Sequence, residues 1–173
     1  HHVVVSGAAP VQVFLPQSLA GDLTVTGTSL ELFNTMNRVT AGGTLTIGDG
    51  ATLKLGGANS FPANFATHVL SPTSTVEYNG FGVNQLVSPE TYGNLVIAAT
   101  GTKTIPAGTT VAGNATMKFG AVVLATGGIT VDGNWNLETD ASFNPGTFTH
   151  FLRGSLTRNG ARWTSTGTLV LDG

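Results

Sequence analysis

The sequence predicts an all-β fold, and within that class a right-handed parallel β-helix (β-solenoid) of about seven or eight coils. Three observations lead to this prediction: short runs in which apolar and polar residues alternate, corners rich in Gly, Asn and Asp between those runs, and an internal repeat. Alternation with period two is typical of a half-buried strand, and the abundant Thr and Val suit a pleated surface. No window longer than about ten residues has the apolar spacing of a helix.

The internal repeat relates segments 72 residues apart, so that residues 21–47 return without a gap as residues 93–119. Apolar and turn positions are retained while charges change, which indicates selection on packing. The matched apolar pairs are Leu23 with Leu95, Val25 with Ile97, Val39 with Val111, Leu45 with Met117 and Ile47 with Phe119. We therefore expect one solenoid domain over residues 1–173, built from the repeats 3–75 and 76–173 and forming a segment of a longer array.

The predicted strands are short and are separated by Gly, Asn, Asp or Pro. In chain order they cover residues 23–26, 30–32, 44–47, 52–55, 76–78, 95–97, 104–105, 129–131 and 169–171. Asp49-Gly50 and Asp132-Gly133 are expected at corners, because Gly tolerates the positive φ of a tight turn. The segment from Ala58 to Val69 contains Pro62 and lacks an apolar stripe, so we expect it to be a loop that protrudes from a coil.

A β-sandwich is the main alternative, because Asn79-Gly80, Asp132-Gly133 and Asn159-Gly160 are hairpin signals. The blocks do not close into paired halves, however, and short faces joined by Gly-containing corners favour a solenoid, whose coils stack at about 4.8 Å. Its interior is expected to be a dry ladder that buries Leu23, Val25, Leu45, Ile47, Leu95, Ile97, Ile129 and Val131. The aromatic residues Phe61, Phe65, Phe81, Phe119, Phe143, Phe148 and Phe151 are interpreted as core stacks or end plugs.

The composition excludes several classes of function. Seven Lys and Arg against nine Asp and Glu give a formal net charge of −2, so there is no basic stripe for nucleic acid and no polybasic patch for an anionic membrane. The absence of Cys excludes disulfides and thiolate metal sites. No apolar run approaches the roughly 20 residues of a membrane span. We expect no nucleic-acid partner and no membrane span.

The ionisable residues do not suggest a catalytic, metal or cofactor site, and we expect the protein not to be an enzyme. Glu138 and Asp140 are the one close acidic pair, and a strand would place both on one face. The basic residues that follow are Arg153, Arg158 and Arg162. β-Helices that cleave polysaccharides gather several carboxylates and a basic residue in one cleft. Here the simpler interpretation is that Glu138 and Asp140 lie in a solvated turn. His68 and His150 are isolated, and His1-His2 is terminal.

Several short segments of the sequence share a recurring pattern of residues. They are residues 74–80, 92–97, 101–105, 111–116 and 131–135, with a further copy at 145–154 in which Arg153 stands where Asn is usual. They resemble the repeats of very large surface proteins from Bacteroidetes-type bacteria, and the resemblance extends over nearly the whole chain. The resemblance implies a secreted, adhesin-like β-solenoid at the cell surface or outside the cell, and it supplies no catalytic residue. Residues 121–173 depart from the 72-residue spacing, which leaves room for an extra coil or two.

A ligand-binding module for glycans or ice is the alternative function. Paired threonines on one strand face are typical of ice-binding solenoids, and the pairs here are Thr24/Thr26, Thr44/Thr46, Thr73/Thr75, Thr102/Thr104, Thr147/Thr149 and Thr164/Thr166. They do not recur once per coil, and β-propensity explains them equally well. Trp135 is expected to pack in the core, and its solvent exposure and that of Trp163 distinguish packing from a sugar platform.

The first and last strand phrases predict a mode of assembly. The chain opens on Val3, Val4 and Val5 and closes on Leu169, Val170 and Leu171. Unpaired backbone groups on terminal coils are templates for strand addition, and charge, Pro or a covering helix normally blunts them. These six residues are therefore the predicted contact for end-to-end self-association, which generates a filament because the contact does not close. Neighbouring repeats of the same protein are the alternative partner for both ends.

Overall fold

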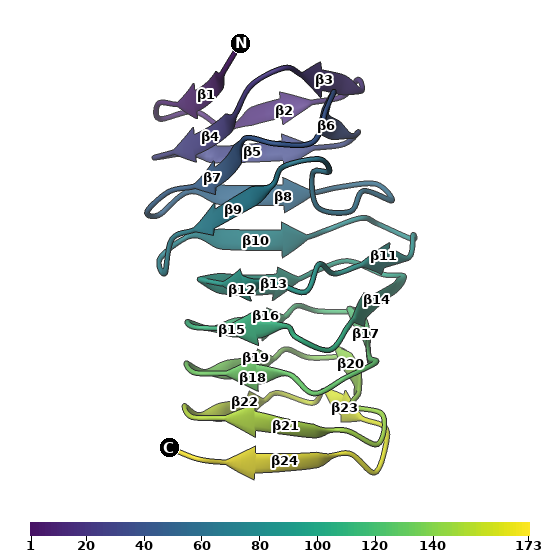
Figure 1. The fold of residues 1–173 in the computed structure, drawn as a ribbon. Coiled ribbons are helices and arrows are strands. Elements are labelled where there is room, and N and C mark those ends of the chain that lie inside the picture. Colours follow the sequence, from purple (N-terminus) through teal and green to yellow (C-terminus); the bar gives the residue numbers. More distant parts are fainter.

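The computed structural model describes residues 1–173 and consists of 24 strands with no helix. The strands form one stack of eight coils, with the N-terminus at one end and the C-terminus at the other (Figure 1). Every ladder is parallel, as the first and last pairs of the main sheet illustrate. The predicted β-solenoid of about seven or eight coils is therefore confirmed.

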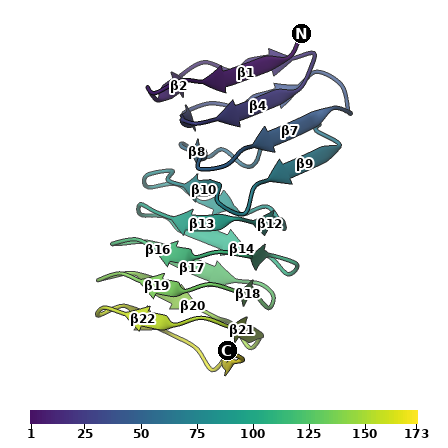
Figure 2. The ribbon, with the colours of Figure 1, turned by 90° about the vertical axis from the view of Figure 1, so that its left-hand side faces the viewer.

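One face, sheet B, runs through the whole stack because each coil contributes one strand to it. Figure 2 shows its later strands one above another. In order, the strands of sheet B are β2 (Val11–Val13), β5 (Ser29–Leu32), β8 (Thr52–Leu55), β10 (Thr75–Tyr78), β13 (Asn94–Ile97), β16 (Ala115–Met117), β19 (Trp135–Leu137) and β22 (Leu156–Arg158).

The other faces change partway along the stack. The early coils use sheet A, which contains β1 (Val3–Ser6), β4 (Leu23–Thr26), β7 (Thr44–Ile47) and β9 (Thr67–Leu70), and the short sheet C, which contains β3 (Gln17–Leu19) and β6 (Met36–Arg38). The later coils use sheet D, with β11 (Gln85–Leu86), β14 (Thr102–Ile105), β17 (Val122–Ala125), β20 (Ser142–Asn144) and β23 (Arg162–Trp163). They also use sheet E, with β12 (Thr91–Tyr92), β15 (Thr110–Val111), β18 (Thr130–Val131), β21 (Thr149–Leu152) and β24 (Thr168–Leu171). We call the step between β9 and β12, which do not pair, the sheet change.

Alternation along the strands produces a continuous apolar interior. Strand β4, for example, buries Leu23 and Val25 and turns Thr24 and Thr26 outward. One hydrophobic cluster extends from Val5 to Ala161. The eight residues predicted to be buried are each at most 2% exposed, which confirms the predicted apolar ladder.

The 72-residue repeat does not relate equivalent places in the fold. Leu23 lies in sheet A and stacks on Leu45, whereas its predicted match Leu95 lies in sheet B and stacks on Val76. Ile47 is buried but its match Phe119 is 65% exposed. The 72-residue repeat therefore reflects only a shared order of strands and corners. The structural repeat is the single coil, because each strand stacks on a strand of the neighbouring coil.

Two further predictions need correction. Phe61, Phe65 and Phe143 are buried as expected, but Phe81, Phe119 and Phe151 are exposed because they lie at corners or on an outward strand position. The segment Ala58 to Val69 is a loop only as far as Ala66, since Thr67 begins β9. That loop covers the edge of β6, where Arg38 N–H donates to the Ala63 carbonyl at 3.0 Å.

A Gly-Asn pair turns three of the later coils from sheet E into sheet B, at Gly93, Gly113 and Gly133, and Gly154-Ser155 takes this place in the last coil. The Asn94 side-chain oxygen accepts from Asn114 N–H at 3.0 Å, and that of Asn114 accepts from Asn134 N–H at 2.9 Å. The glycine before each Asn is required by close approach, because a Cβ on Gly133 would lie 2.4 Å from the Gly113 carbonyl oxygen. These corners stack the coils in register.

Candidate functional site

The two edge strands of sheet B, β2 and β22, form the first candidate site. One inward column of this sheet begins at Val11 and ends at Leu156. These two residues are 39% and 38% exposed, whereas the six residues between them in the column are at most 5% exposed. The column is thus buried except in the first and last coils.

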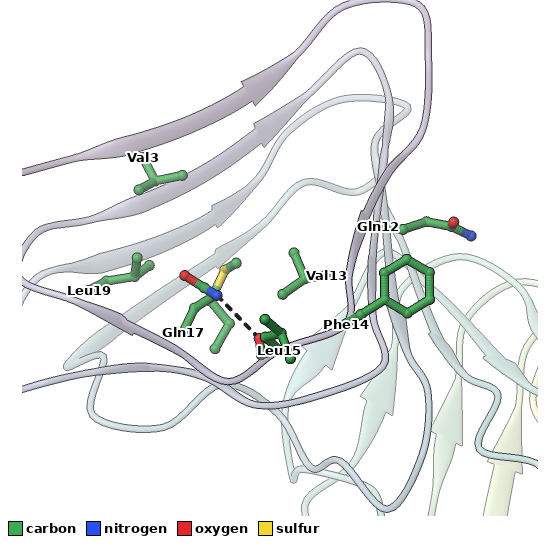
Figure 3. Close-up of a pocket in the computed structure, with 8 residues that line it drawn as sticks. Val3, Gln12, Val13, Phe14, Leu15, Gln17 and Leu19 are labelled. Carbon is green, nitrogen blue, oxygen red and sulfur yellow. Dashed lines mark hydrogen bonds between the residues drawn. The ribbon is translucent and has the colours of Figure 1, made fainter.

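The N-terminal end is an open hollow of about 410 Å³. Val3, Val13, Leu15 and Leu19 line it, and Figure 3 shows their side chains around the space. Gln17 reaches across it and donates from Nε2 to the Leu15 carbonyl at 3.3 Å. The hollow is the uncovered top of the solenoid core.

The C-terminal end is a matching hollow of about 320 Å³, to which Leu156, Trp163 and Leu169 contribute. Arg158 also lines it, because this residue occupies the inward position that Leu137 fills one coil earlier. Its Nε donates to the Ala161 carbonyl at 2.7 Å. The C-terminal end is therefore apolar with one cation at its rim.

The predicted assembly residues lie at these ends. Val3 and Val5 point inward on β1, which pairs only with β4, and Val4 is 63% exposed on the outer side. Leu169 and Leu171 occupy inward positions on β24, which pairs only with β21. Each terminal strand thus presents one unpaired edge, and such edges are templates for strand addition.

The second candidate region is the sheet change, where buried polar side chains gather. His68 Nδ1 on β9 lies 2.7 Å from Glu90 Oε1, just before β12. The hydroxyls of Tyr78 and Tyr92 lie 3.1 Å apart, and Tyr92 donates to the Ser88 carbonyl at 2.7 Å. Burial raises the pKa of Tyr78 to about 12. These bonds connect coils where the backbone ladder is interrupted.

Lys103 is the most unusual residue near the sheet change. Its side chain is fully buried, and Nζ donates to the carbonyls of Gly80 at 2.8 Å, Thr100 at 2.9 Å, Val83 at 3.0 Å and Gly101 at 3.3 Å. Burial lowers the pKa of the Lys103 ammonium. No carboxylate contacts it, so the carbonyl oxygens of two corners supply all of its acceptors.

Sequence reasoning did not single out Lys103 or its stacking neighbour Gln85. Gln85 donates from Nε2 to the Leu55 carbonyl at 2.8 Å and accepts from Gly80 N–H at 2.9 Å. The available signal was alternation: Thr102 and Thr104 share one face, so Lys103 shares the other face with buried Ile105. The alternation identifies the inward position, but the carbonyl acceptors come from distant corners.

Glu138 and Asp140, the acidic pair considered for catalysis, do not form a catalytic pair on a strand. β19 ends at Leu137, so Glu138 and Asp140 lie in the following turn, where Asp140 has φ of 59°. The favoured interpretation of this pair as part of a solvated turn is therefore confirmed. Glu138 accepts from Phe119 N–H at 3.1 Å. Arg153 pairs instead with Asp132 at 2.5 Å.

His150 is buried in an aromatic cluster and does not line a cleft. Its ring centroid lies 5.5 Å from that of Phe143 and 6.2 Å from that of Trp135. Nδ1 accepts from Ile129 N–H at 3.3 Å, and Nε2 donates to the Pro145 carbonyl at 3.0 Å. This pattern holds a neutral imidazole, and burial lowers its pKa. Trp135 is 1% exposed, as expected for a packing residue.

The threonines do not form the regular array that ice recognition uses. On the outer face of sheet A, Thr24 stacks on Thr46, but Val4 and Val69 complete that column. Thr102 and Thr104 stack on Val122 and Leu124. The paired columns are interrupted within two or three coils.

The fold and these ends define the chain as a parallel β-solenoid with an apolar core open at both ends. Comparisons with models of known families, with curated proteins and with solved structures found no match. The chain contains no helical segment with the length and hydrophobicity needed to cross a bilayer.

Proposed function

We propose that this chain is a structural segment of an extracellular, adhesin-like β-solenoid, and that it serves as a stalk or filament-forming unit. Its ends associate with further copies or with neighbouring repeats of the same protein. The observation that carries the proposal is the single column of sheet B that is buried in six coils and exposed only at Val11 and Leu156. Covering both ends removes apolar surface from water, which favours association.

The proposal assigns no enzymatic activity. Glu138 accepts from a backbone N–H and Arg153 pairs with Asp132, so these candidate residues do not share a site. The half-buried pair His68 and Glu90 connects two coils. A catalytic site brings a nucleophile, acid or base into one accessible pocket, whereas the two largest hollows here are lined mainly by apolar residues.

Location at the cell surface is supported by the resemblance of the repeat phrases to those of bacterial surface proteins. The sparse charge and the absence of Cys are compatible with such repeats. Detection of the intact protein on unpermeabilised source cells, with loss after external protease treatment, tests this part of the proposal. A signal that appears only after lysis contradicts it.

Sedimentation over a range of protein concentrations tests the association. We expect the average mass to rise with concentration, and the variant Leu156→Glu to remain monomeric because it places a charge in the end column. Phe81→Glu is the matched control, since it removes an apolar residue that is 79% exposed but lies at a corner in the middle of the stack. A constant monomer mass for the parent chain contradicts the proposal.

A further inference from the structure

We propose that a hollow between the second and third coils binds a neutral sugar ring. The hollow has a volume of about 260 Å³, and its two walls come from the corner after β5, within residues 32–37, and from the loop between β8 and β9, within residues 58–63. Both walls are internal to the chain. The site therefore depends neither on where the chain begins or ends nor on the proposed association.

The hollow exists because the pairing between these two coils opens at the corner. Stacked residues of sheet B are 23 positions apart at this step but 19 to 21 apart in the last four steps. The additional residues lie in the corner, and no backbone hydrogen bond joins residues 34–37 to residues 58–62. Pairing resumes where Arg38 N–H donates to the Ala63 carbonyl at 3.0 Å. The two walls are thus held together at one edge of the hollow.

Two asparagines supply hydrogen-bond donors that the chain itself does not use. The Asn34 side-chain oxygen accepts from Thr35 N–H at 2.9 Å, and that of Asn37 accepts from Ala63 N–H at 2.8 Å. These bonds fix both amides, while their Nδ2 groups donate to no other atom of the chain. Thr35 and Ser60 add hydroxyls at the exposed rim. Polar groups are therefore available on both walls.

The apolar lining and the lack of charge indicate the class of ligand. Leu32, Met36 and Phe61 line the hollow and are each at most 8% exposed. No ionisable residue lines it, and the guanidinium of the adjacent Arg38 donates instead to three backbone carbonyls. Apolar walls with a few polar groups that fix orientation are typical of small-molecule sites. A neutral sugar fits this lining, because its ring has hydroxyls around its edge and C–H groups on its faces.

The size of the hollow agrees with this class. Its volume lies slightly below the roughly 300–1,000 Å³ of sites for drug-sized ligands, which suits a single ring.

An NMR titration of the nitrogen-labelled chain tests the site, because it reports both binding and its place. The probes are methyl β-galactoside, methyl α-mannoside and N-acetylglucosamine, with glucuronic acid as the anionic comparison. We expect at least one neutral sugar to shift the side-chain amide signals of Asn34 and Asn37 and the backbone signal of Ala63. Glucuronic acid should shift them much less. No shift with any of the three neutral sugars overturns the inference, as do shifts confined to other residues or an equal response to glucuronic acid.

Isosteric variants test the role of the two amides. Asn34→Asp and Asn37→Asp each keep the oxygen that accepts a backbone N–H but remove the free donor, so we expect each to weaken sugar binding about tenfold. Asn84→Asp is the matched control, because the Asn84 oxygen accepts from Thr102 N–H at 3.0 Å in a corner outside the hollow. It should bind like the parent chain.

Thermal unfolding establishes that each variant is folded before binding is compared. If Asn37→Asp loses its fold with the bond to Ala63, the comparison uses Asn34→Asp, whose bond is to the next residue of its own corner. Equal affinity of the folded variants and the Asn84→Asp control overturns the inference. The sedimentation result for the parent chain is independent of this outcome, so either proposal fails without the other.

Discussion

At the scale of single residues, Lys103 shows how this solenoid accommodates a charge in its core. Its ammonium has lost its water and has no carboxylate partner, which is costly in a low-dielectric interior. Four carbonyl oxygens from the corners at residues 80–83 and 100–101 replace that water. Corner carbonyls also need donors, so the lysine and the corners satisfy one another.

Lys103→Met should destabilise the protein, because it keeps the apolar stem but leaves these carbonyls without their donor. We expect a loss of about 1–3 kcal/mol or more, the cost of leaving a buried polar group unsatisfied. Lys54→Met is the matched control: Lys54 points outward on sheet B, and its loss should change stability by less than about 0.5 kcal/mol. Urea unfolding of both variants measures the difference, and equal stability would contradict the assigned role.

His150 should make stability depend on pH. Because burial lowers the pKa of its imidazole, the unfolded chain, with an ordinary pKa near 6.5, takes up a proton before the folded chain does. Its contribution is therefore complete above about pH 6.5 and is lost as the pH falls further. Unfolding free energies at about pH 7.5 and about pH 5.5 test this; His150→Phe should lose less stability over that interval. An identical loss in the variant would assign the effect to other groups.

At the scale of the strand, each inward column behaves as a unit. Leu45 stacks between Leu23 and His68 in sheet A and is fully buried. Leu45→Ala should therefore cost about 2–5 kcal/mol, the range for a cavity in a close-packed core. Its neighbour Thr46 points outward, so Thr46→Ala should have a much smaller effect. Chemical unfolding compares the two, and similar losses would contradict the assigned facing of β7.

The sequence predicts the facing of a strand well because alternation is local, although the nine predicted strands are fewer than half of the 24 observed. Runs such as 44–47 and 52–55 have the facing that alternation indicates. It does not predict which sheet a strand joins, since this depends on coil length and on stacking against residues about 20 positions away. For that reason Leu23 and Leu95 have similar sequence surroundings but lie in different sheets. The end residues were predicted as a site, whereas the polar contacts at the sheet change depend on non-local neighbours.

At the scale of the whole molecule, sheet B connects two halves that are otherwise paired differently. Sheets A and C occupy the early coils, and sheets D and E occupy the later ones (Figure 1). The ends of this rod share an open apolar core, and the net charge of −2 provides little long-range repulsion between copies. These properties support the proposed role as a stalk or filament segment.

Electron microscopy of the purified chain at high concentration tests this account most directly. Copies stacked end to end form a rod in which each adds its eight coils, so we predict filaments with an axial repeat of roughly 40 Å. Leu156→Glu, which charges the end column, should abolish them. Separate particles of single-chain size at every concentration would contradict end-to-end assembly, and filaments with an unrelated axial repeat would contradict coil-on-coil stacking.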